Sequence, residues 1–273
     1  MKNSFKEAKY AFVDTENNKG YIDIESSLLA LYQLEKIIDE PMQLALFIGN
    51  SGVGKSMILK SIHKKLRHQK EIHYIETPFL CENDFLSTLF SILADESAPQ
   101  DNDVNFNGII KYCNSLKSKR EIIILLDEAQ MYSDTIFEQI RLISDTKIVK
   151  FVIVLHNIGE KSILTEPHFK TRIWSKIELA NASKQEMVAY IHSKLLNANV
   201  SNIVSYIGDG EFKLIHKYTS GNYRECNKLM FSAFELCELS EFNTNNNMFE
   251  DSSNVFSRKM IELSALKLGL AHA

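Results

Sequence analysis

Residues that interrupt regular structure are scarce in this sequence, and long apolar runs are missing. Ten glycines and four prolines are spread over 273 residues, which leaves long stretches free for helices and strands. Nowhere do the roughly 18 consecutive apolar residues of a membrane span occur, and charges interrupt Met1–Tyr10, where a signal peptide would carry an apolar region. We therefore expect a cytoplasmic protein without a membrane span.

Closely spaced cysteines are missing too. Cys81, Cys113, Cys226 and Cys237 are far apart in the sequence and form no C-x-x-C pair, so neither a zinc site nor a redox dithiol is indicated. Reduced and mostly buried thiols are the expectation.

An excess of positive charge is the third absence. Lys and Arg total 31 against 35 Asp and Glu, a net charge of −4, whereas proteins that bind nucleic acid non-specifically are usually strongly basic. Contact with DNA would need a local basic stripe. Two short stretches either offer one or are solvated helix ends, because cations favour helix C-termini. These stretches contain Lys60, Lys64, Lys65, Arg67 and Lys70, and Lys117, Lys119 and Arg120.

What is present is an ordinary globular composition with 45% hydrophobic and 24% charged residues, enough for one substantial core and a small second domain. Short runs rich in Ile, Val and aromatic residues predict strands, and two of them lack polar alternation, as central parallel strands do. Helical patterns such as Ile58, Ile62 and Leu66 separate these runs, which predicts an α/β sheet. The strand runs are Leu44–Ile48, Glu71–Glu76, Ile122–Leu126, Phe151–Leu155 and Lys176–Leu179.

Strand patterns stop after residue 179. Ser183 and Glu186 form a capping-box pattern that opens a helix, and residues 181–240 predict a small all-helical domain. Glu241–Asn254 predicts an exposed loop. Asn254–Leu268 predicts a last amphipathic helix, which packs on this domain or binds a partner. We thus expect two domains, residues 1–180 and residues 181–273.

The most informative segment runs from Gly49 to Ser56 and reads Gly-Asn-Ser-Gly-Val-Gly-Lys-Ser. It matches the phosphate-binding pattern G-x-x-x-x-G-K-[ST], with a predicted strand before it and a predicted helix after it. Glycines let the backbone direct several N–H groups at phosphate oxygens, and the helix adds its positive N-terminal end. Lys55 would reach the β- and γ-phosphates, and the Ser56 hydroxyl would bind Mg²⁺. The expected nucleotide-binding residues here are Gly49, Asn50, Ser51, Gly52, Val53, Gly54, Lys55, Ser56 and Met57.

The predicted strand Ile122–Leu126 ends in two carboxylates. Asp127 would hold Mg²⁺, and Glu128 is placed to polarise the attacking water, since hydrolysis needs a base opposite the leaving phosphate. The next strand along the chain ends in His156 and Asn157. An amide at Asn157 could hold the water beside the γ-phosphate; a turn-forming Asn is the alternative. His156 is either a proton relay or a solvated loop residue.

Two arginines complete the set. Arg172 precedes the strand Lys176–Leu179, and Arg224 follows Gly-Asn-Tyr at the start of a predicted helix. Arginine stays charged and can neutralise the charge that builds on a transferring phosphoryl group. A surface ion pair is the alternative for each.

In this order, the motifs resemble those of the AAA+ ATPases, from about residue 10 to residue 268. The resemblance implies a P-loop NTPase fold, with three α/β/α layers around a five-stranded parallel sheet of order 5-1-4-3-2, and a small helical lid. It also implies ATP and Mg²⁺ as cofactors, and a ring or filament of subunits. The implied roles are Walker A for Lys55 and Ser56, Walker B for Asp127 and Glu128, sensor 1 for Asn157, the nucleotide-contacting sensor 2 for Arg224, and an arginine finger acting on a neighbouring subunit for Arg172.

Within that family, Asp-Glu-Ala-Gln at 127–130 and Gly-Asn-Tyr-Arg at 221–224 are most similar to the ExeA/MshM group. These are cytoplasmic ATPases tied to type II secretion, MSHA-type pilus biogenesis and DNA uptake. The group commonly has Gly-Gln where this chain has His156 and Asn157. ExeA continues into a membrane span and a peptidoglycan-binding region that these residues lack, so an ATPase-only, pilus-type member is expected.

The resemblance implies an oligomeric ATPase that assembles or regulates a cell-envelope machine, held at the inner membrane through membrane-anchored partners. Transposition regulators of the TnsC/TniB type share the motifs, so a DNA-associated regulator is the alternative, which the net charge ranks second. A switch that barely hydrolyses ATP is disfavoured by Glu128. Near the N-terminus, Tyr10 or Phe12 lies either against adenine or in the core.

Overall fold

The computed structural model describes residues 4–13, 22–94, 105–116, 120–157, 170–244 and 256–271. Contacts within the chain divide it into two compact units. The α/β unit contains Ser27–Asn50 and Gly54–Leu179, and the helical unit contains Met1–Ser26, Ser51–Val53 and Ala180–Ala273. The division after Leu179 lies within one residue of the expected boundary, but Met1–Ser26 groups with the helices, whereas we expected it in the α/β unit.

The α/β unit is built on a five-stranded sheet with the order β2-β3-β4-β1-β5, in which all neighbouring strands are parallel. Read from the other edge, this is the order 5-1-4-3-2, so the expected topology is confirmed. Every residue of β1, β3 and β4 is buried, as in a sheet that is covered on both faces. The strands are β1 (Leu44–Gly49), β2 (Glu71–Ile75), β3 (Ile122–Leu126), β4 (Val149–Leu155) and β5 (Ile173–Leu179).

β4 begins at Val149, two residues earlier than predicted. The polar residue that hid this start is Lys150, whose side chain is buried. Its ammonium donates to the carbonyl oxygens of Ile38 (3.1 Å) and Glu40 (2.7 Å) and forms an ion pair with Glu121. A buried lysine is tolerated here because it is paired and hydrogen-bonded.

β5 begins at Ile173, three residues earlier than predicted. It is an edge strand, and Trp174 and Lys176 are exposed within it. An edge strand is covered on fewer sides than a central one, so its first half lacks the continuous apolar run on which the prediction depended.

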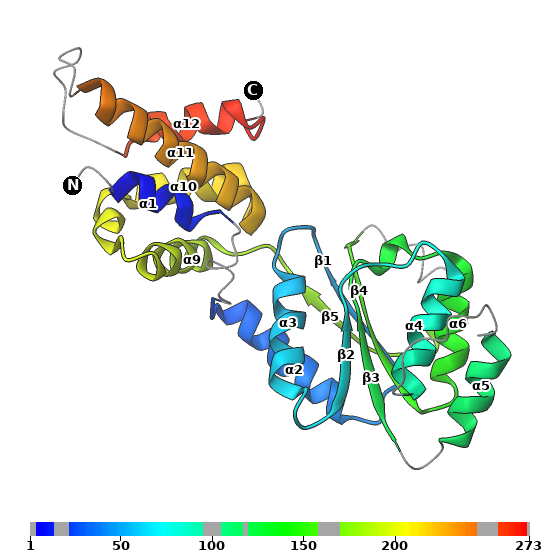
Figure 1. The fold of residues 1–273 in the computed structure, drawn as a ribbon. Coiled ribbons are helices and arrows are strands. Elements are labelled where there is room, and N and C mark those ends of the chain that lie inside the picture. Colours follow the sequence, from blue (N-terminus) through cyan, green and yellow to red (C-terminus); the bar gives the residue numbers. More distant parts are fainter. Residues whose placement is uncertain are drawn as a thin grey trace. The chain divides into compact units, whose positions relative to one another are not determined.

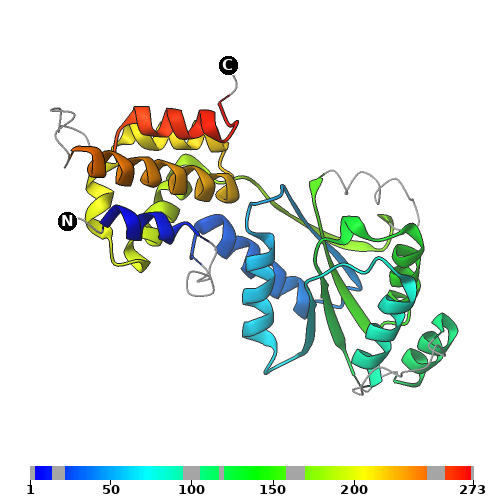
Figure 2. The ribbon, with the colours of Figure 1, turned by 45° about the horizontal axis from the view of Figure 1, so that its top comes forward.

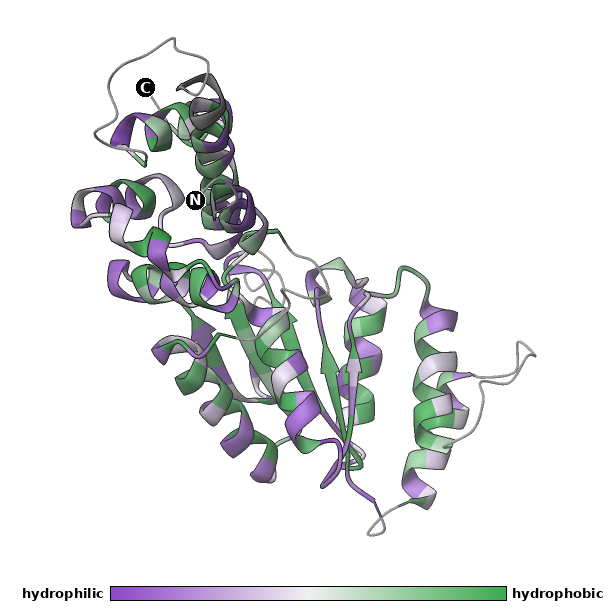
Figure 3. Ribbon diagram, turned by 60° about the vertical axis from the view of Figure 1, so that its left-hand side comes forward, coloured by the Kyte–Doolittle hydropathy of each residue, from purple (hydrophilic) through white to green (hydrophobic). Residues whose placement is uncertain are grey.

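Helices cover both faces of the sheet, as Figure 1 shows: α2 and α3 lie on one face, and α4, α5 and α6 lie on the other. Figure 3 shows strands that are largely hydrophobic between helices of mixed character. The predicted three layers are therefore present. The helices are α2 (Glu25–Asp39), α3 (Lys55–Leu66), α4 (Glu82–Ala94), α5 (Phe106–Ser115) and α6 (Asp134–Ser144).

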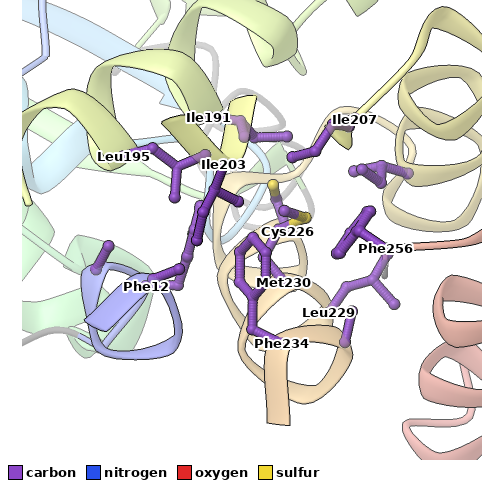
Figure 4. Packing of buried hydrophobic residues seen from close by; sticks show 14 of the residues in the cluster. Phe12, Ile191, Leu195, Ile203, Ile207, Cys226, Leu229, Met230, Phe234 and Phe256 are labelled. Carbon is purple, nitrogen blue, oxygen red and sulfur yellow. The ribbon is translucent and has the colours of Figure 1, made fainter. Parts of the chain in front are cut away.

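The helical unit has a core of its own, which Figure 4 shows from close by. Phe234 lies in this core, and its ring centroid is 6.1 Å from that of Phe5 and 5.9 Å from that of Phe12. These contacts explain why the N-terminal segment belongs to this unit, and they place Phe12 in a core. The elements are α1 (Ser4–Ala11), α9 (Lys184–Asn197), the 3-10 turn η3 (Ser201–Tyr206), α10 (Asp209–Thr219), α11 (Tyr223–Thr244) and α12 (Arg258–Lys267).

α11 and α12 lie side by side in this unit (Figures 1 and 2). α11 continues to Thr244, so the loop predicted from Glu241 begins too early; residues 245–254 of that prediction lie outside the described residues. α12 begins only at Arg258, and its Ile261 and Ala265 are buried in the core of the helical unit. The predicted packing of the last helix on this unit is therefore confirmed.

Candidate nucleotide-binding site

The residues of the predicted site in the α/β unit meet at the carboxyl edge of its sheet. In the parallel register, Ile48 of β1 pairs with Leu155 of β4, and Leu126 of β3 pairs with Ile153. The segments that follow β1, β3 and β4 therefore leave the sheet at one edge. This edge is where open α/β sheets bind ligands.

The phosphate-binding loop connects β1 to α3, as predicted. Lys55 is the first residue of α3, and Ser56 and Met57 follow in its first turn. The Lys55 side chain is buried and its ammonium donates to the carbonyl oxygens of Gly49 (2.7 Å) and Asn50 (2.9 Å). The lysine is thus folded back inside the loop, which places its charge where phosphate oxygens would lie.

The apex of the loop, Ser51–Val53, is grouped with the helical unit. The Asn222 amide donates to the Ser51 carbonyl oxygen (2.6 Å), and Arg224 Nη1 donates to Ser51 Oγ (2.8 Å). Gly52 has a φ of 81°, and a Cβ there would lie 2.4 Å from Asn222 Oδ1 and 2.9 Å from Arg224 Cβ. Only glycine fits this conformation and this close approach.

Asn222 is a residue that the sequence-based prediction missed. Its Nδ2 donates to Ser51, as described above. Its Oδ1 accepts hydrogen bonds from the backbone N–H groups of Arg224 (3.0 Å) and Glu225 (3.2 Å). It therefore caps the N-terminus of α11 and ties that helix to the loop apex. The signal was available, because Asn immediately before a helical pattern is a typical N-cap.

Asp127 follows β3 and is 2% exposed. The Tyr74 hydroxyl donates to its Oδ2 (2.9 Å), and the backbone N–H of Glu128 donates to its Oδ1 (2.9 Å). Burial, and then the charge of Asp127, raise the pKa of Tyr74 far above its ordinary value, so the phenol stays a donor. Tyr74 was also missed, since nothing in the sequence links β2 to the acidic pair.

Glu128 lies beside two further side chains, Gln130 and His156. Gln130 Nε2 donates to Glu128 Oε2, and His156 Nε2 lies 3.4 Å from Glu128 Oε1 and 3.2 Å from Oε2. His156 is therefore not simply a solvated loop residue. Gln130 was not predicted as a site residue, although it lies only two positions after Glu128.

Asn157 reaches the loop from the end of β4. Its Nδ2 donates to Asn50 Oδ1 (3.0 Å), so two of the predicted site residues are in contact. Its Oδ1 is buried and has no hydrogen-bond partner among the described residues. A buried acceptor without a donor is unusual, and a water or ligand donor would satisfy it.

Arg172 lies at the amino ends of the strands, whereas the phosphate-binding loop lies at their carboxyl ends. It precedes Ile173, which pairs with Leu44 at the amino end of β1. Its Nε contacts Asp145 Oδ1 at 2.7 Å, at the end of α6. The structure thus places Arg172 away from the Lys55 loop of the α/β unit.

Three of the five cations in the basic stretch at residues 60–70 form ion pairs. Lys60 pairs with Glu76, Lys65 with Glu35 at 2.5 Å, and Lys70 with Asp39 at 2.7 Å. In the second stretch, Arg120 pairs with Glu71, while Lys117 and Lys119 lie outside the described residues. These pairs favour the alternative of solvated helix surfaces over a basic stripe.

The donor groups fit a magnesium nucleotide. Within the described ranges, no cluster of three or more His, Cys, Asp or Glu side chains forms a complete metal site. Mg²⁺ is typically held by one or two protein ligands together with substrate phosphates. Ser56 and Asp127, each on the segment the motif requires, would supply those ligands, since each carboxylate oxygen has lone pairs beyond its hydrogen bond.

The comparisons with known proteins agree with this geometry. The family model described as AAA domain matches residues 38–164. General secretion pathway protein A of Aeromonas hydrophila is 26% identical over 162 residues, which cover 55% of this chain and 29% of that protein. The chain thus spans less than a third of the length of this relative. The resemblance inferred from the motifs is confirmed by both matches.

Solved structures with this fold include a DNA-bound protein and a domain of a replication initiation protein. The Aeropyrum pernix ORC1 protein in complex with DNA has a TM-score of 0.63 at 12% identity and covers 95% of this chain and 69% of its own. Cdc6p from Pyrobaculum aerophilum has a TM-score of 0.59 at 14% identity, and the match covers 86% of this chain and 66% of Cdc6p. Domain III of Thermotoga maritima DnaA has a TM-score of 0.52 at 14% identity, and the match covers 90% of this chain and 94% of the DnaA domain.

Among the helices that the structure describes, none is long and apolar enough to cross a membrane. The sheet order, the loop geometry and the matches to known proteins are consistent with one another. The chain contains an AAA domain over residues 38–164, is homologous to General secretion pathway protein A, and has the P-loop fold of the AAA+ ATPases.

Proposed function

We propose that this protein binds ATP with Mg²⁺ and hydrolyses it to ADP and phosphate. The proposal depends on four groups that lie at the carboxyl ends of the strands. They are the phosphate-binding loop with Lys55, the buried Asp127, the carboxylate of Glu128 and the amide of Asn157. Each has a defined part in phosphoryl transfer to water.

The binding roles follow from the groups present. Lys55 would exchange its carbonyl partners for the β- and γ-phosphate oxygens, and Ser56 and Asp127 would hold the metal. The metal ion neutralises charge on the phosphates when bound. Arg224 donates to Ser51 at the loop apex, and we assign it a further contact with the nucleotide.

The hydrolytic roles belong to Glu128 and Asn157. Glu128 would take a proton from the attacking water, and a general base typically contributes 10²–10⁴-fold to a rate. The unpartnered Oδ1 of Asn157 would accept a hydrogen bond from the same water. Arg172 would act on ATP bound to a neighbouring copy of the chain, in a ring or filament.

Two point variants test this function. Lys55→Ala should lose ATP binding, because the charge that faces the phosphates is gone. Glu128→Gln should bind ATP and hydrolyse it at least a hundredfold more slowly. Lys64→Ala removes an exposed lysine of α3, the helix that begins at Lys55, and is the control for both variants. Undiminished hydrolysis by Glu128→Gln would remove Glu128 from the mechanism.

We further propose that hydrolysis drives or regulates a cell-envelope machine, of the type II secretion, MSHA-type or type IV pilus, or DNA-uptake kind, in the cytoplasm or peripherally at the inner membrane. The homology to General secretion pathway protein A supports this. A strain that lacks the protein should lose secretion or piliation, and the wild-type chain but not Glu128→Gln should restore it.

A DNA-associated regulator of the TnsC/TniB type is the alternative. The ion pairs of Lys60, Lys65 and Lys70 speak against it. ATPase activity measured with and without duplex DNA, at two salt concentrations, separates the two functions, because DNA contacts through phosphates weaken steeply with salt. Stimulation by DNA at low salt only would favour the regulator.

A further inference from the structure

Glu128, Gln130 and His156 form a closed set of contacts in the α/β unit. The Gln130 amide uses both of its ends: Nε2 donates to Glu128 Oε2, and Oε1 accepts from the backbone N–H of His156 at 3.3 Å. The His156 ring closes the set at 3.2 Å from Glu128 Oε2. Two residues, Gln130 of the 3-10 turn η2 (Ala129–Met131) and His156 directly after β4, therefore contact one carboxylate.

The carboxylate needs such support. Glu128 has a φ of 51°, in the left-handed region that non-glycine residues rarely adopt. Its side chain is 39% exposed, and an exposed glutamate side chain can adopt several rotamers unless partners hold it. Without partners the carboxylate would sample solvent-facing rotamers.

We propose that Gln130 and His156 are positioning residues that hold the Glu128 carboxylate in the orientation for polarising the attacking water. The proposal rests on the proposed function, in which Glu128 is the base. Two donors on one carboxylate restrict its rotation, and a misplacement of about 1 Å can cost a hundredfold in rate.

The same contacts connect the base to the residue proposed to sense the γ-phosphate. His156 directly precedes Asn157, whose side chain contacts Asn50 at the start of the phosphate-binding loop. A shift of the β4 end therefore moves the Glu128 partner and the Asn157 amide together.

The test compares kcat, KM and ATP affinity in the full chain. His156→Ala and Gln130→Ala should each lower kcat at least tenfold and leave the Kd for ATP within twofold, because neither residue lies on the phosphate-binding loop. His156→Gln keeps a side-chain donor and should recover most of the lost rate. His68→Ala, at an exposed histidine of the same unit, is the control.

Combining His156→Ala with Glu128→Gln distinguishes a positioning role of His156 from a structural one. If His156 acts only through the carboxylate, adding His156→Ala to Glu128→Gln should cause no further loss in single-turnover hydrolysis. An equal loss in both backgrounds, or an unchanged kcat in both single variants, would overturn the inference. Thermal unfolding identifies any variant that fails to fold, in which case Gln130→Ala carries the test. A Glu128→Gln protein with wild-type hydrolysis would instead refute the proposed base itself.

Discussion

At the residue scale, Asp127 is the carboxylate that we propose as a ligand of Mg²⁺. Its carboxylate is buried, and each oxygen already accepts one hydrogen bond, from the Tyr74 hydroxyl and from the Glu128 backbone. A hydrogen bond to a charged group contributes about 1.5–3 kcal/mol. The two donors both stabilise the buried charge and fix the plane of the carboxylate.

The Tyr74 hydroxyl should therefore matter for Mg²⁺. In Tyr74→Phe the carboxylate loses one donor, and we expect the Mg²⁺ concentration for half-maximal ATPase activity to rise severalfold, with ATP affinity in the absence of Mg²⁺ unchanged. Tyr32→Phe, at an exposed tyrosine of α2, is the matched control. An unaltered Mg²⁺ titration would mean that the Glu128 backbone N–H alone orients Asp127.

At the scale of elements, Glu186 accepts hydrogen bonds from two separate segments of the helical unit. The backbone N–H of Glu186 donates to Ser183 Oγ (3.2 Å) and Glu186 Oε2 accepts from the Ser183 N–H (2.8 Å), the capping box predicted from the sequence. Its Oε1 accepts from the backbone N–H of Ser26 (3.0 Å), in the first turn of α2. Burial works against the charged form, but the hydrogen bonds from Ser26 and Ser183 prevail and lower the pKa of Glu186 below its ordinary value of 4.5.

A carboxyl group whose pKa is lower in the folded state stabilises the fold above its unfolded pKa and loses that effect as the pH falls through the folded value. We therefore expect the wild type to be more stable than Glu186→Gln above about pH 5. The difference should shrink as the pH falls below 4.5. Urea unfolding of both proteins between neutral and acidic pH measures this. Glu7→Gln, at an exposed position of α1, is the control; a pH-independent difference would contradict the prediction.

Several element boundaries could be predicted and others could not. β1 and β3 are continuous apolar runs between clear breaks, and both were predicted within one residue. The start of β4 was hidden by Lys150, whose partners come from the end of α2 and from Glu121. A lysine that finds its acceptors far along the chain looks, in the sequence, like the end of a buried strand.

At the scale of the whole molecule, Arg172 lies at the amino ends of the strands, and the phosphate-binding loop of the same chain lies at their carboxyl ends. β1 separates the two edges with six residues, about 20 Å at the usual rise of a strand. An arginine side chain cannot cover that length. If Arg172 takes part in hydrolysis, it does so on a neighbouring copy, which is the arrangement that we propose.

Mixing two inactive variants tests this arrangement. Arg172→Ala should bind ATP but turn it over slowly, and Lys55→Ala should not bind ATP but still offer its arginine. Mixed oligomers should then recover part of the wild-type rate, whereas neither variant alone should. The control is Asp145→Ala, which removes the acidic partner of Arg172. If Asp145→Ala reproduces the Arg172→Ala defect and mixing restores nothing, the arginine serves its ion pair alone.

The sequence by itself determined the parts whose chemistry is local. The phosphate-binding loop, the acidic pair after β3 and the capping box of α9 each lie within a few residues, so spacing alone predicts their geometry. The parallel sheet also followed from local runs, because strands covered on both faces carry continuous apolar sequence.

Only the tertiary structure decided which side chains support those parts. Tyr74 and Asp127 are 53 positions apart, and His156 and Glu128 are 28 positions apart. Their meeting depends on the strand register and on which residue of each strand leaves the sheet last. The same holds for Arg172, whose distance from the loop follows from the direction of β5, and for Phe5 and Phe12, whose burial groups the N-terminal segment with the helical unit. Contacts between elements far apart in the chain are set by packing, which no local pattern encodes.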